Sequence, residues 1–185
     1  AILATVTFVG GVITGPANSF AFVYGESVLL LGAHRVALIV TASGITGLAG
    51  LYVGRTISHR VSRLPIVATG TILSAVGSAL AYFGGAGAFV IGYLLAIAAG
   101  GLVTPAHVAL STESFRHANR AAAAGWILVA GVAGAVVGLA TFGAIVNGAG
   151  GLHPLRTGAL VTFLICLPSL LTLRMLPDRS RLDLH

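Results

Sequence analysis

The chain has 185 residues, of which 57% are hydrophobic and only 8% are charged, and its mean hydropathy is +1.03. A soluble domain of this length cannot bury so much apolar surface, because a small globule exposes a large share of its area. The net charge of +6 comes from arginines scattered among apolar segments, which argues against a nucleic-acid-binding surface. The composition therefore predicts an integral membrane protein whose main partner is the lipid bilayer.

Six apolar segments are each long enough to cross the hydrocarbon core, which takes about 20 helical residues. In chain order, the expected transmembrane helices cover residues 2–24, 35–54, 65–84, 88–110, 121–147 and 158–177. The charged and turn-forming residues fall between these segments. We therefore expect an all-α fold, a polytopic membrane bundle of six transmembrane helices in a single domain over residues 1–185.

The first and fourth segments share a short motif in which a polar side chain follows Pro-Ala. Asn18 follows Pro16 and Ala17, and His107 follows Pro105 and Ala106. The two segments cross the membrane in opposite directions, so the motif suggests two inverted three-helix repeats. Asn18 is expected either to line a cavity or to bond a neighbouring helix. His107 is expected either to take part in proton movement or to be structural.

Polar side chains within the segments are candidates for a substrate cavity enclosed by the first, second, fourth and fifth helices. The candidates are Asn18, Ser19, Ser43, Thr46, Thr104 and His107. No charged residue lies deep in any of the six segments. A polyanion would need arginine or lysine inside the membrane, so this set favours a neutral or amphipathic small molecule.

Several glycines are spaced four residues apart, as in helices whose backbones approach closely in membranes. The pairs are Gly11 with Gly15, Gly50 with Gly54, and Gly134 with Gly138. We expect these pairs to lie at tight helix–helix contacts.

The arginines predict the orientation of the chain, because short cytoplasmic loops carry an excess of basic residues. Eight arginines fall on one side of the six segments, and only Arg35 and Arg156 fall on the other. Both ends of the chain are then cytoplasmic, in a cell (cytoplasmic) membrane. Tyr24, Tyr82 and Tyr93 would lie near the outer interface, where amphipathic rings are favoured.

The loop after the second segment, GRTISHRVSRLP at residues 54–65, resembles the G-x-x-x-D-R-x-G-R-R signature of the major facilitator superfamily. His59 takes the acidic position, Arg60 and Arg63 take basic positions, and Ser62 replaces the glycine. In this family the signature follows helix two and, usually decayed, helix eight. The resemblance implies that the six helices are helices seven to twelve of a longer chain. The N-terminal six-helix half would then be a partner.

The stretch from Glu113 to Arg120 reads E-x6-R and resembles the family's loop before helix eleven. With Arg60 and Arg63 on the same side, these residues are candidates for a cytoplasmic gate. Arginine pairs well with carboxylates, and exposed pairs contribute only about 0–1 kcal/mol, which suits contacts that must break during transport. The alternative is that the arginines serve only to fix the topology.

The resemblance implies a secondary active transporter that moves a small molecule by alternating access, with proton-coupled efflux as one form of that activity. Motifs for other membrane functions do not fit. The sequence Thr41-Ala42-Ser43-Gly44 lacks the first glycine of a rhomboid-like protease motif, and both Pro-Ala turns lack the asparagine of an aquaporin. No enzymatic activity, cofactor or metal is expected. A stand-alone six-helix scaffold or channel, and a half-size transporter that acts as a dimer, stay open as alternatives.

Overall fold

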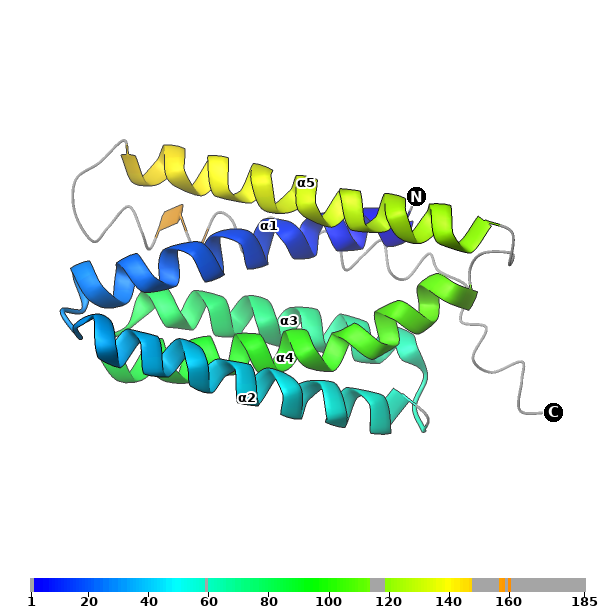
Figure 1. Ribbon diagram of the computed structural model, residues 1–185, viewed down its shortest axis with the longest axis horizontal. Helices are drawn as coiled ribbons and strands as arrows, with labels where there is room; N and C mark the ends of the chain where they lie inside the picture. Colours follow the sequence, from blue (N-terminus) through cyan, green and yellow to red (C-terminus); the bar gives the residue numbers. More distant parts are fainter. Residues whose placement is uncertain (1, 59, 114–118, 148–156, 159, 161–185) are drawn as a thin grey trace.

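The computed structural model describes residues 2–58, 60–113, 119–147, 157–158 and 160. Almost all of these residues are helical (Figure 1). The elements are α1 (Ile2–Val23), the π-helical turn η1 (Tyr24–Val28), α2 (Ala33–Ser58), α3 (Arg63–Phe83), α4 (Ala86–Glu113) and α5 (Arg120–Asn147). The all-helical fold is confirmed, and the five α-helices lie where the first five apolar segments were expected. The sixth segment, 158–177, falls almost entirely outside the described residues.

All five helices are long and apolar enough to cross a membrane. The shortest, α3, has 21 residues, which at 1.5 Å per residue gives about 31 Å, close to the thickness of the hydrocarbon core. Helix α2 is longer than the expected 35–54, and its end turns carry Arg35 and Arg55. Long arginine side chains reach the interface from such positions, so their charge does not end the helix.

The helices pack as pairs that follow the inverted-repeat pattern. The most extensive contacts join α1 to α5, α2 to α4, and α3 to α4, and Figure 1 shows α1 and α5 lying side by side. If α1 to α3 form one repeat and α4 begins the next, α4 corresponds to α1 and α5 corresponds to α2. The α1–α5 pair is then the counterpart of the α4–α2 pair.

Glycines allow α1 and α5 to approach closely. A methyl group added at Gly134 would collide with the carbonyl oxygen of Phe8, and one added at Gly138 would collide with that of Val12. From the opposite helix, a Cβ at Gly15 would lie 2.8 Å from the carbonyl oxygen of Ala135. These contacts confirm the close packing expected from the glycine spacing.

The α2–α4 interface repeats the same arrangement. Added methyl groups at Gly50 and Gly54 would collide with the carbonyl oxygens of Ala98 and Leu102, respectively. In both interfaces, two glycines four residues apart on one helix lie over two carbonyls four residues apart on the other. This shared geometry is independent support for the two inverted repeats.

Three tyrosines expected near the outer interface are in fact core residues. Tyr24 and Tyr82 are each 1% exposed and Tyr93 is 5% exposed. Their rings pack with Phe89 and Phe142, with the Tyr24 and Tyr82 centroids 5.0 Å apart. Helix packing therefore encloses these rings inside the bundle, and their expected depth near the outer interface stays a prediction.

The Tyr82 hydroxyl bonds to α1 next to Pro16, a proline inside that helix. Pro16 lacks a backbone N–H, so it weakens the hydrogen bonding of the helix around it. The Tyr82 hydroxyl of α3 lies 3.4 Å from the Pro16 carbonyl oxygen and 3.1 Å from that of Ala17, and it donates to this pair. The carbonyl that loses its helical partner to Pro16 is that of Val12, four residues earlier, so the Tyr82 bonds tie α3 to α1 beside the proline without replacing the lost bond.

Candidate functional site

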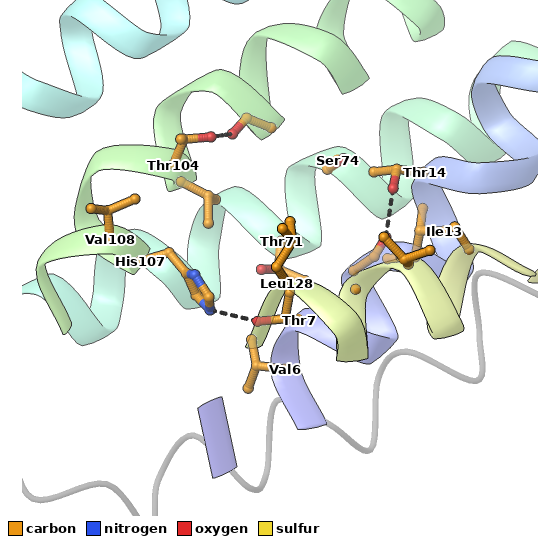
Figure 2. A pocket seen from close by; sticks show the side chains of 17 residues that line it. Val6, Thr7, Ile13, Thr14, Thr71, Ser74, Thr104, His107, Val108 and Leu128 are labelled. Atoms are coloured by element: carbon orange, nitrogen blue, oxygen red, sulfur yellow. Dashed lines mark hydrogen bonds between the residues drawn. The ribbon is translucent and has the colours of Figure 1, made fainter. Parts of the chain in front are cut away.

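A cavity of about 420 Å³ lies among α1, α3, α4 and α5 (Figure 2). Its lining is mostly apolar, with hydroxyl groups and one imidazole. The polar side chains are Thr7, Thr14, Thr71, Ser74, Thr104 and His107. This cavity is lined with α3 in place of α2, and the expectation that the first, second, fourth and fifth helices face a central cavity stays a prediction. Helix α2 packs on α4 and contributes no lining residue.

His107 joins α4 to α1 at one end of the cavity. Its Nε2 lies 3.1 Å from Thr7 Oγ1, and Figure 2 shows the imidazole directed toward that hydroxyl. The Thr7 hydroxyl donates its one proton to the Leu3 carbonyl oxygen at 2.8 Å. This pattern assigns the proton of the imidazole to Nε2, which donates to Thr7. In the neutral ring, Nδ1 is then a hydrogen-bond acceptor.

The other hydroxyl groups of the cavity also donate to backbone carbonyls. Thr14 donates to Gly10 at 3.0 Å, Thr71 to Val67 at 2.7 Å, and Thr104 to Gly100 at 2.9 Å. Ser74 of α3 donates to the Ala96 carbonyl of α4 at 3.2 Å. Each hydroxyl has a single proton, so these groups offer a ligand only their lone pairs.

A second, smaller chamber of about 20 Å³ adjoins the cavity, and Thr14 and Ser74 line both spaces. Here α1 and α4 are joined a second time, because the Tyr93 hydroxyl lies 3.2 Å from Asn18 Oδ1 and donates to it. Asn18 and His107 both follow a helix proline by two residues. Each therefore bridges to the opposite repeat from an equivalent position.

The structure separates the predicted cavity residues into two groups. Thr104 and His107 line the main cavity, and Asn18 lines the small chamber. Ser43 and Thr46 line neither space. Ser43 is buried on α2 close to the Tyr93 hydroxyl, and the Thr46 hydroxyl lies 3.3 Å from the Leu94 carbonyl oxygen of α4. These two residues therefore fix α2 against α4.

Ser19 is exposed on α1 and also lines neither space. The main cavity is also lined by four residues that were not among the predicted ones, namely Thr7, Thr14, Thr71 and Ser74. A helical periodicity could have identified two of them, because Thr7, Thr14 and Asn18 are spaced at i, i+7 and i+11 on α1. Residues with this spacing share one face of a helix.

The gate candidates lie at helix ends on one side of the bundle. Arg63 begins α3, Arg120 begins α5, and Arg60 precedes α3, while α4 ends at Glu113. Figure 1 shows these ends together on the side where α1 starts. The Glu113 side chain and the 114–118 loop lie outside the described part of the structure, so the gate stays a prediction.

The fold and the cavity define a polytopic membrane protein with a mostly apolar cavity, bearing a few polar side chains, among its helices. A family model described as the Major Facilitator Superfamily matches residues 1–183. The chain therefore belongs to the major facilitator superfamily, as the loop motifs indicated, and is a transporter of that general type rather than an enzyme. No curated protein matches the chain closely enough to report.

Proposed function

We propose that this chain forms the substrate-binding half of a secondary active transporter that works by alternating access, and that the 420 Å³ cavity holds the substrate. The observation that carries the proposal is the position of the cavity between the two repeats. Across the cavity, α1 and α4 are bridged by the His107–Thr7 and Tyr93–Asn18 hydrogen bonds, while the extensive α1–α5 and α3–α4 contacts form its sides. Single hydrogen bonds contribute about 0.5–1.5 kcal/mol each, so the two α1–α4 bridges can break and re-form during transport.

The chemistry of the lining supports a particular class of substrate. The hydroxyls of Thr14, Thr71, Ser74 and Thr104 offer acceptors only, and neutral His107 adds another. The remaining lining is apolar. We therefore propose an amphipathic substrate with an apolar body and a hydrogen-bond donor, such as an amine or an alcohol. An anion would meet lone pairs and no fixed positive charge.

The same chemistry supports coupling to protons. Protonation of His107 would place a positive charge and a new donor in a cavity otherwise built of acceptors. A positively charged amine substrate and the proton that binds His107 would then compete, because the cavity would hold two like charges if both were bound. This is the behaviour expected of an exporter that exchanges its substrate for protons.

Two helix faces support a partner for this half. Helices α2 and α5 have the smallest buried shares among the five candidate spans, and α5 exposes Trp126, Val129 and Val137 away from the cavity. The two helices occupy equivalent positions in the two repeats. We propose that a second six-helix half covers part of these faces in the cytoplasmic membrane. The end that carries Arg55, Arg60, Arg63 and Arg120 would then face the cytoplasm, with the Glu113 gate on that side.

A transport panel tests the substrate class. The full-length protein in proteoliposomes is expected to move amphipathic amines or alcohols, and to ignore organic phosphates of similar size, because the cavity lacks fixed positive charge. Each compound is assayed with and without an imposed proton gradient, with empty liposomes as the control. Selective transport of a polyanion would contradict the proposed substrate class. Absence of gradient dependence would contradict the proton coupling.

A further inference from the structure

Ser78 of α3 is a buried residue whose hydroxyl oxygen keeps some accessible surface toward a small chamber, and no hydrogen bond to it is found within the part of the protein that the structure describes. Ser78 is 3% exposed and lines the small chamber next to Asn18 and Tyr93. Buried polar groups are nearly always hydrogen-bonded to protein or to ordered water. An unpaired hydroxyl inside a membrane bundle is therefore a sign of a ligand that completes it.

The small chamber has the size and the polarity to hold such a ligand. Its volume is about 20 Å³, and about 10–15 Å³ suffices for one water molecule. Six polar side chains line it, from α1, α3 and α4. They are Thr14, Asn18, Ser74, Ser78, Tyr82 and Tyr93. A stable buried water needs two to four polar partners, and this chamber offers that many.

We propose that one ordered water molecule occupies this chamber and accepts a hydrogen bond from Ser78. The donor and acceptor groups around it are complementary. The Asn18 oxygen already accepts from Tyr93, so the amide N–H groups of Asn18 are the donors it can offer. The Thr14 and Ser74 hydroxyls donate to carbonyls and can accept the protons of the water.

Water fits the chamber better than a cation does. All of the lining side chains are uncharged, and no carboxylate is among them. A bare cation would lack charge compensation in a low-dielectric bundle. A water molecule needs only the neutral donors and acceptors that are present.

The water extends the hydrogen-bonding surface of the main cavity. Thr14 and Ser74 line both spaces, so the water connects the rim of the cavity to the Tyr93–Asn18 bridge between the repeats. It thereby links α1, α3 and α4 at one point. This site does not depend on which substrate the protein carries.

Hydroxyl-radical labelling by brief X-ray irradiation tests the site, because radicals form at water and modify the side chains beside it. The experiment uses the full-length protein in nanodiscs and reads modification at each tyrosine by mass spectrometry. Tyr82 and Tyr93 line the chamber, whereas Tyr24 is equally buried and lines neither space. We expect Tyr82 and Tyr93 to be modified severalfold faster than Tyr24, with Tyr52 as an exposed reference. Equal protection of all three buried tyrosines would overturn the proposal.

A variant distinguishes a bound water from solvent that enters through the main cavity. Ser78→Val removes the hydroxyl and fills the chamber with methyl groups. Its matched control is Thr41→Val on the exposed face of α2, where the hydroxyl bonds only its own helix. Ser78→Val is expected to lower modification of Tyr82 and Tyr93 severalfold, and Thr41→Val to leave it unchanged. Undiminished modification in Ser78→Val would show that the radicals come from elsewhere. The wild-type comparison decides the proposal if Ser78→Val does not fold.

Discussion

Replacing Gly50 with valine is expected to prevent α2 from packing on α4. Even the Cβ of the new side chain would collide with the Ala98 carbonyl oxygen, and backbone atoms cannot move aside as a flexible side chain can. Overpacking of this kind costs about 1–3 kcal/mol and sometimes more. The expected result is a marked loss of monodisperse full-length protein after detergent extraction, with a lower thermal midpoint in what remains.

The same helix provides the control for this substitution. Gly44 lies on α2 with no atom within 4 Å of an added Cβ, so Gly44→Val changes composition equally without a collision. The repeat relationship predicts that Gly134→Val, which meets the Phe8 carbonyl, behaves like Gly50→Val. Its control is Gly143→Val on α5, where an added Cβ also has open space. Equal losses in all four variants would contradict the close-packing account.

Replacing His107 is expected to reduce transport and to change how transport depends on pH. Alanine at this position removes the bond to Thr7 and the acceptor in the cavity. A hydrogen bond to a charged substrate group is worth about 1.5–3 kcal/mol, so kcat/KM for an amine substrate should fall by roughly 10-fold or more. In the wild type, substrate affinity should rise with pH as the imidazole loses its proton. Histidine is the side chain that ordinarily changes charge between about pH 5 and 8.

The variant His107→Gln separates titration from hydrogen bonding. Glutamine can still bond to Thr7 and offer an acceptor, but it carries no charge at any pH. Its substrate affinity should therefore be nearly independent of pH over the range in which the wild type varies. Binding of the best substrate from the transport panel, measured at several pH values for both proteins, checks this result. A wild-type pH profile in His107→Gln would place the titrating group elsewhere.

The features that depend on one helix at a time could be predicted from the sequence. Hydropathy and the positions of arginine predicted the first five helices, because each segment that crosses a bilayer must by itself be long and apolar enough to do so. Glycine spacing also identified the close contacts, since Gly50 and Gly54 allow the approach of any neighbouring backbone. The motif after each helix proline drew attention to Asn18 and His107, which line the small chamber and the main cavity, respectively, while their role in transport stays a prediction.

The features that depend on which helices meet could not be predicted in the same way. Ser43 and Thr46 are polar residues of the kind expected in a cavity, yet they lie in the contact between α2 and α4 and line neither space. Thr71 and Ser74 appeared to be ordinary membrane-helix residues until the fold placed α3 against the cavity. The burial of the three tyrosines could not be predicted for the same reason, because an amphipathic ring at a helix end can face either lipid or a neighbouring helix.

Substrate protection of a single cysteine tests most directly whether the cavity is the transport site. Val132 of α5 lines the cavity and is 59% exposed, whereas Val136, one turn further along, is 60% exposed and does not line it. Val132→Cys and Val136→Cys are made in the full-length protein with the native Cys166 replaced by serine, and each is treated with a small maleimide. The transported compound is predicted to slow modification at position 132 in proportion to its occupancy and to leave position 136 unaffected. Equal rates at position 132 with and without a saturating transported compound would contradict the assignment of this cavity as the substrate site.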